Sequence, residues 1–214
     1  MSEPARFVAA NTALLSPPLV PEIRLYLATE VVPLWRKTEE ELEAEGVPPP
    51  YWAFAWAGGQ ALARYVLDHP AEAAGKRVLD FGSGSGLVAI AAAKAGAADI
   101  LAADIDAFAC AAIALNAIAN GVVLRVTHND VIGMPCTWDT ILVGDMCYER
   151  PLAERLLAWL GDCARDGATV LLGDPGRSYF PKSGVEKLGT YNVQTTRDLE
   201  DREIRETSVY RFTG

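Results

Sequence analysis

The sequence predicts an α/β fold with a mostly parallel sheet, an antiparallel hairpin at its C-terminal end and a helical appendage at its N-terminus. Short apolar strands alternate with Ala-rich helices between residues 77 and 174, which indicates a parallel sheet with helices on both faces. A glycine-rich run, GSGSG, directly follows the first of these strands. Near the C-terminus, two segments alternate polar and apolar residues as paired strands do.

Residues 1–50 are expected to form the appendage, and residues 51–214 the domain. A chain of 214 residues fits one domain with a short addition. Apolar residues in PEIRLYLA (21–28) recur at helical spacing, and Pro21 suits a first helical turn. A second helix is expected through TEEELEAEG, with Thr38 as its N-cap and Gly46 as its stop.

The domain begins with a predicted helix over residues 58–70, which Pro70 ends. Strands are then predicted at RVLDFG (77–82), DILAADI (99–105), VLRVTHND (123–130), TILVGD (140–145) and ATVLLGD (168–174). Helices are predicted over 86–96, 107–120 and 151–164. Gly96 and Gly121 stand where the first two of these helices should stop.

The last forty or so residues follow a different pattern. A short helix is expected around SYFPKSGVEKL (178–188). KLGTYNVQTTR and REIRETSVYRFTG alternate like strands, and the charged turn RDLEDRE joins them. Five parallel strands followed by such a hairpin are the layout of the Rossmann-like, seven-stranded class I methyltransferase fold.

Composition and charge argue against a nucleic-acid partner, a membrane span and a metal site. The net charge of −9 argues against a nucleic acid bound through its phosphates. No apolar run is long enough to predict a membrane span, and the N-terminal residues do not have the pattern of a signal or transit peptide. We therefore expect a cytoplasmic protein. The four cysteines form no CxxC pair and the two histidines lie apart, so no metal site is expected.

The run VLDFGSGSG (78–86) predicts a cofactor loop at the end of the first strand. Gly82, Gly84 and Gly86 allow the backbone to turn sharply and to pass close to a ligand. A dinucleotide loop needs a small residue at the sixth position, where this chain has Leu87. The GxGxG spacing after Asp80 fits S-adenosylmethionine instead, because that carboxylate can accept a hydrogen bond from the cofactor's amino group, directly or through water.

Two more acids end the next two strands. Asp104 follows the second strand, where a carboxylate can hold both ribose hydroxyls. Asp106 competes for this role, but its position favours capping of the next helix. Asp130 follows the third strand and is placed to accept a hydrogen bond from the adenine amino group; the alternative is a solvated turn residue.

The fourth strand ends in GDMCYE (144–149). The neighbouring strand end faces the substrate when the first strand holds the cofactor, so Asp145 and Tyr148 are expected to line the acceptor pocket. A buried acid at a strand end without a target would be costly. Glu149 is either a second site acid or the start of the next helix.

These motifs resemble one known family. The segment PPYWAFAWAGGQALARYVLDHP, the glycine loop, ILAADIDAFA, GDMCYE and GDPGRSYF are similar to the electron-transfer-flavoprotein β-subunit lysine methyltransferases, and LVPEIRLYLATEVVPLW (19–35) extends the similarity over nearly the whole chain. These enzymes carry a D-x-x-Y motif, here Asp145 to Tyr148. The resemblance implies that Trp56 packs beside the cofactor, although this chain has Ala57 where the family has proline. Animal members carry a mitochondrial presequence that is missing here, which indicates a bacterial enzyme.

The resemblance implies a protein-lysine N-methyltransferase that converts S-adenosylmethionine to S-adenosylhomocysteine and acts on the electron transfer flavoprotein β subunit. One alternative is a small-molecule N- or O-methyltransferase, which would differ only in the acceptor pocket. Another is a non-catalytic methyltransferase-like binding module, but the intact GDMCYE motif argues against it.

Overall fold

The computed structural model of the chain describes residues 1–28, 49–195 and 204–214. The helix predicted at TEEELEAEG and the turn predicted at RDLEDRE lie outside these residues. Along the described part of the chain, no helix combines the length and the apolar character that crossing a bilayer requires.

A seven-stranded sheet forms the centre of the molecule, in the order β5-β4-β3-β6-β7-β9-β8. Its strands are β3 (Arg77–Phe81), β4 (Asp99–Ala103), β5 (Arg125–Thr127), β6 (Thr140–Gly144), β7 (Thr169–Asp174), β8 (Val185–Gln194) and β9 (Ile204–Phe212). The first five are parallel to one another, whereas β9 runs antiparallel to both β7 and β8. The predicted fold class is therefore confirmed.

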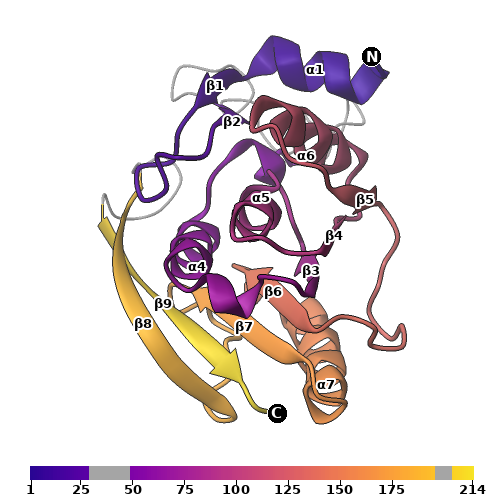
Figure 1. The fold of residues 1–214 in the computed structure, drawn as a ribbon. Coiled ribbons are helices and arrows are strands. Elements are labelled where there is room, and N and C mark those ends of the chain that lie inside the picture. Colours follow the sequence, from indigo (N-terminus) through magenta and orange to yellow (C-terminus); the bar gives the residue numbers. More distant parts are fainter. Residues whose placement is uncertain (29–48, 196–203) are drawn as a thin grey trace.

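Helices cover both faces of this sheet (Figure 1). They are α4 (Ala57–Asp68), α5 (Leu87–Lys94) and α6 (Ala107–Ala119) on one face, and α7 (Arg150–Arg165) on the other. Two 3-10 helices, at Tyr51–Ala53 and Pro70–Glu72, flank α4. Because side chains alternate along a strand, Val78 of β3 is buried on the α4 and α5 side and Leu79 on the α7 side.

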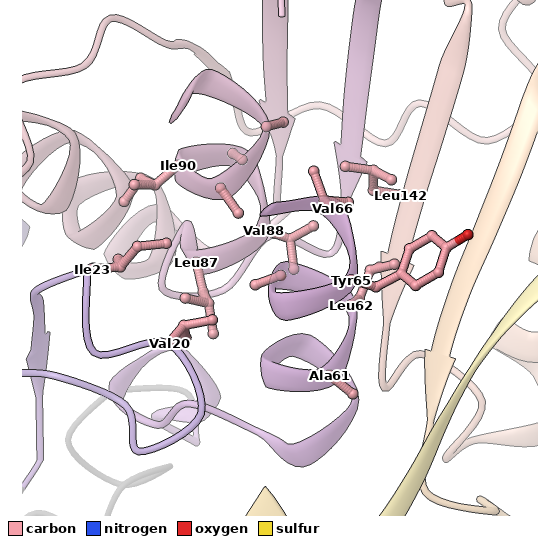
Figure 2. Close-up of a cluster of buried hydrophobic side chains, with 14 of the residues drawn as sticks. Val20, Ile23, Ala61, Leu62, Tyr65, Val66, Leu87, Val88, Ile90 and Leu142 are labelled. Carbon is pink, nitrogen blue, oxygen red and sulfur yellow. The ribbon is translucent and has the colours of Figure 1, made fainter. Parts of the chain in front are cut away.

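The core on the α4 and α5 side includes residues from the N-terminal segment. Figure 2 shows Val66 of α4 close to Val88 of α5, and Val20 and Ile23 of the N-terminal segment beside Leu87 and Ile90 of α5. Burial of such aliphatic side chains contributes roughly 1.5–3 kcal/mol each. The N-terminal segment is thus held to the domain by apolar packing.

The described part of that segment contains α1 (Glu3–Asn11), β1 (Ala13–Leu15) and β2 (Leu25–Leu27). Of these, α1 and β2 lie next to α6 (Figure 1), and β1 pairs with β2. The backbone N–H of Tyr26 donates to Oδ1 of Asn116, at 2.7 Å, and the rings of Phe7 and Phe108 make an edge contact. The boundary at residue 50 stays a prediction.

Two of the predicted helices are wrong. In 21–28 the buried residues are Ile23, Leu25 and Leu27, an alternation of period two, and β2 pairs with β1 in antiparallel register. In 178–188, Pro181 and the left-handed backbone of Gly184 exclude a helix, and β8 begins at Val185. The other predicted helices and strands within the described residues are present.

Candidate active site

A cavity of about 740 Å³ opens beyond the carboxyl ends of β3, β4 and β6. Here the chain crosses from one side of β3 to the other, which is where doubly wound sheets bind ligands. The volume is that of a site for a small molecule. A second cavity, of about 50 Å³, shares five lining residues with the first: Trp56, Gly82, Gly84, Gly144 and Asp145.

The glycine loop has the backbone that its sequence predicts. Gly82, Gly84 and Gly86 have φ angles of 62°, 54° and 82°, in the left-handed region that favours glycine. A β-carbon at Gly86 would meet Ile113 of α6 at 3.4 Å. Gly82 and Gly84 line both cavities, so the loop brings bare backbone to the ligand space.

Asp80 lies beneath the loop and is 1% exposed. Its Oδ2 accepts hydrogen bonds from the hydroxyl of Ser83, at 2.5 Å, and from the backbone N–H of Ala89, at 2.9 Å. Burial raises the pKa of this carboxyl to about 7, against those two hydrogen bonds. Asp80 lines the smaller cavity, so it can meet a cationic group there.

Asp104 stands at the end of β4 and lines the large cavity. Its Oδ2 accepts the N–H of Gly84, at 2.8 Å, and its Oδ1 accepts the N–H of Asp106, at 3.0 Å. These bonds fix the carboxylate between the glycine loop and α6. Asp106 caps α6 through the N–H of Phe108, so the capping interpretation of Asp106 is confirmed.

Asp130 lines the large cavity. Its Oδ1 accepts the N–H of Ile132, at 3.0 Å, and its Oδ2 accepts from Nη2 of Arg155, at 2.8 Å. This arginine holds the pKa of Asp130 below its ordinary value. The carboxylate is thus half exposed and ion-paired, a position that fits the turn interpretation and leaves the contact with adenine a prediction.

Asp145 follows β6 at the wall between the two cavities. Its φ is 59°, the only positive φ of a non-glycine residue in the described parts of the chain, and such backbone is found most often at functional sites. The side chain is nearly buried. Its Oδ2 accepts the N–H of Gly59 in the first turn of α4, at 3.1 Å. The positive end of the α4 dipole therefore faces this carboxylate.

Arg177 is a site residue that sequence reasoning did not assign. Its Nε and Nη2 donate to Oδ1 of Asp145 at 3.0 and 2.8 Å, and its guanidinium lies 5.7 Å from the centre of the Trp56 ring. Asp174, at the end of β7, holds this loop by accepting the N–H groups of Gly176 and Arg177, both at 2.7 Å. The motif GDPGRSYF contained both residues, but nothing in it indicated the contact of Arg177 with Asp145.

Glycines bring α4 against these strand ends. A β-carbon at Gly58 would overlap the carbonyl oxygen of Gly173, and one at Gly144 would lie 3.0 Å from Cα of Gly59. None of these glycines was among the predicted site residues, although a GG pair in a helical pattern can indicate close packing.

Aromatic rings form the mouth of the large cavity. The ring of Tyr51 lies 6.1 Å from those of Trp56 and Tyr148, and all three residues line the cavity. Tyr148 is 45% exposed, so it faces both the cavity and solvent. Glu149 stands at the N-cap of α7, with its side chain exposed and making no capping hydrogen bond.

The structure thus brings Asp80, Asp104, Asp145, Tyr148, Trp56 and the glycine loop around connected cavities, with Asp130 at the edge and Glu149 at the start of α7. Within the described residues, no three His, Cys, Asp or Glu side chains are grouped as metal ligands would be. The bare loop, the buried carboxylate of Asp80 and the size of the large cavity fit S-adenosylmethionine.

Known proteins are similar to this chain in sequence. Electron transfer flavoprotein beta subunit lysine methyltransferases of Xenopus laevis and Homo sapiens are 40% and 38% identical to it; they align with 98% and 96% of this chain and with 87% and 80% of their own length. The family model for ribosomal protein L11 methyltransferase matches residues 60–142, from α4 to β6.

Solved structures share its fold. Magnesium protoporphyrin IX methyltransferase from Synechocystis PCC 6803, with bound S-adenosylmethionine, superposes with a TM-score of 0.52 at 20% identity. The match covers 72% of this chain and 80% of that one. At this identity the likeness concerns the fold, which is that of class I methyltransferases.

Proposed function

Since this chain belongs to the family of electron transfer flavoprotein beta subunit lysine methyltransferases, it is an S-adenosylmethionine-dependent protein-lysine methyltransferase, and we propose that its substrate is the β subunit of the electron transfer flavoprotein. Over 96–98% of the chain the relatives named for this activity are 38–40% identical. The proposal of this substrate rests on the protein for which these relatives are named.

We propose that the cofactor occupies both cavities. Its amino group would face the carboxylate of Asp80, and its ribose hydroxyls would face Asp104. Support comes from the burial of Asp80 beside the smaller cavity and from the way two backbone N–H groups orient Asp104. Trp56 would pack beside the cofactor, and Asp130, while paired with Arg155, would accept a hydrogen bond from the adenine amino group.

When bound, S-adenosylmethionine supplies a methyl group that its sulfonium already activates, so the protein chiefly aligns and desolvates the acceptor. A lysine attacks only as the neutral amine, although its free pKa is about 10.4. The apolar walls of this cavity favour the neutral form, because burial disfavours a charged amine. Asp145 would accept a hydrogen bond from the amine and direct its lone pair. No side chain is assigned as general base.

This mechanism depends on the position of Asp145. It is the buried carboxylate at the wall common to both cavities, and a left-handed backbone together with contacts from α4 and Arg177 holds it there. Tyr148 would form the wall along which the lysine chain enters, since its ring faces that of Tyr51 at the mouth. Glu149 would start α7 rather than contact the amine.

The partner is a protein rather than a nucleic acid in this proposal. The net charge of −9 suits a substrate surface that presents lysines, whereas it would repel a phosphate backbone. A cytoplasmic location stays a prediction.

Methylation of the flavoprotein provides the test. Purified enzyme with isotope-labelled S-adenosylmethionine should transfer label to the β subunit of purified electron transfer flavoprotein, and the Asp145→Ala variant should not. Mass spectrometry of the flavoprotein from cells with and without the gene should show methylated lysines only in the former. Label that appears only in the small-molecule fraction of a cell lysate would contradict the proposed substrate and favour a small-molecule methyltransferase.

A further inference from the structure

Among the arginine–aspartate pairs in the described parts of the chain, that of Arg177 and Asp145 is distinguished by the burial of both side chains. The two side chains are 20% and 10% exposed, whereas those of the Arg77–Asp139 pair are 56% and 43% exposed. Exposed pairs of the latter kind contribute little to stability. A nearly buried carboxylate is costly to keep ionised unless it is paired and hydrogen-bonded.

Both the backbone and the guanidinium group of Arg177 are held by contacts. The side chain of Asp174 fixes its backbone through the N–H groups of Gly176 and Arg177. Its guanidinium lies over Trp56 and donates twice to a single oxygen of Asp145. The contact is therefore built into the loop after β7, and it leaves Oδ2 of Asp145 to the N–H of Gly59.

The groups that face Asp145 have opposing effects on its charge. Burial raises the pKa of Asp145, and Arg177 and the N–H groups of Gly58 and Gly59 oppose that effect. Two other buried groups lie close by, Asp174 at the end of β7 and the thiol of Cys147, and Asp80 lines the smaller cavity with Asp145. Arg177 is the side-chain cation that lowers the pKa of both Asp145 and Asp174.

We infer that Arg177 is a positioning residue for methyl transfer, which keeps the Asp145 carboxylate ionised and in one orientation at the wall of the acceptor cavity. This inference rests on the proposed role of Asp145. Arg177 donates to Oδ1 of Asp145 and Gly59 donates to Oδ2, so both oxygens are held and an incoming amine would meet a carboxylate of fixed orientation.

The pH dependence of the reaction tests this inference. Rates of β-subunit methylation are measured from pH 5.5 to 9 for the wild type, R177Q and R177K. Loss of the cation in R177Q should move the acidic limb of kcat/KM upward by about one to three pH units, with a loss of about tenfold or more at pH 7 that recovers at pH 9. R177K retains the charge and should keep the acidic limb of the wild type.

Asp174→Asn should shift the acidic limb of kcat/KM in the opposite direction to R177Q. An asparagine at this position can still accept the N–H groups of Gly176 and Arg177, but it no longer repels Asp145. Its acidic limb should therefore move to lower pH. A wild-type profile in R177Q, an equal loss at every pH, or the same loss in R177K as in R177Q would overturn the inference.

A titration of the Asp145 carboxyl separates this inference from the proposed function. Carbon-13 NMR of aspartate-labelled protein, with Asp145→Asn to assign the resonance, needs no substrate. The carboxyl should titrate at higher pH in R177Q than in the wild type, and equal titration would refute the inference. If the wild type methylates no flavoprotein, the proposed substrate is wrong, and the titration alone then decides the role of Arg177.

Discussion

Gly58, in the first turn of α4, lies directly against the carboxylate of Asp145: a β-carbon at Gly58 would stand 2.5 Å from Oδ2 and 2.8 Å from Cγ of Asp145. The same β-carbon would overlap the carbonyl oxygen of Gly173. Because Gly58 has no side chain, α4 can cross the ends of β6 and β7 at this short distance. The N–H of Gly59 then reaches Asp145.

Gly58→Ala should therefore damage both stability and catalysis. Overpacking of this kind costs about 1–3 kcal/mol, and backbone oxygen atoms cannot move aside as a flexible side chain can. Gly59→Ala is the matched control, because a β-carbon there meets nothing within 4 Å and the N–H is retained. Urea unfolding and methylation rates should show a loss in the first variant only. Equal stability of the two variants would mean that α4 can shift without cost.

Asp145→Ala should keep the affinity for S-adenosylmethionine and lose methyl transfer by about 10²-fold or more, the size of effect that misalignment of a reacting group produces. Asp139→Ala is a suitable control. Asp139 pairs with Arg77 and directly precedes the first residue of β6, whereas Asp145 follows the last one. Calorimetry gives the affinity, and single-turnover transfer gives the rate. Normal turnover by Asp145→Ala would remove this carboxylate from the mechanism.

The strand-end acids could be predicted because their positions depend on local sequence. Asp80 is the last residue but one of β3, Asp104 and Asp145 directly follow β4 and β6, and parallel strands end at the same edge of the sheet. Their partners depend on tertiary structure. Arg177 reaches Asp145 only because β7 pairs with β6 and Asp174 turns the next loop back over the strand ends, and no local pattern encodes that pairing.

The error at residues 21–28 has a related cause. Ile23, Leu25 and Leu27 occupy alternate positions, but the apolar residues of such a short stretch also fit helical spacing. Pairing of β2 with β1 and the hydrogen bond from Tyr26 to Asn116 decide in favour of a strand. Both partners lie outside the segment, so its own sequence could not distinguish the two structures.

The affinity for S-adenosylmethionine should weaken as the pH falls through about 7. Burial raises the pKa of Asp80 to about 7, so the carboxyl of the free protein becomes protonated below that pH. A cationic amino group binds the ionised form, and binding must then displace a proton. Calorimetry at pH 7.5 and 5.5 should differ by about tenfold or more. Asp80→Asn should bind weakly at both values, and a constant wild-type affinity would exclude Asp80 as the partner of the amino group.

Substitutions of Tyr148 can show whether this residue acts through its ring, as part of the cavity wall, or through a hydrogen bond of its hydroxyl. Its ring lies 6.1 Å from that of Tyr51, and the residue is 45% exposed, a position in which the ring surface matters more than the hydroxyl. Tyr148→Phe should therefore keep kcat/KM near that of the wild type. Tyr148→Ala opens the wall and should lose on the order of tenfold, the value of an aromatic contact. If phenylalanine is as poor as alanine, then the hydroxyl is the functional group, and Tyr148 acts by orienting Asp145 rather than by guiding the lysine chain.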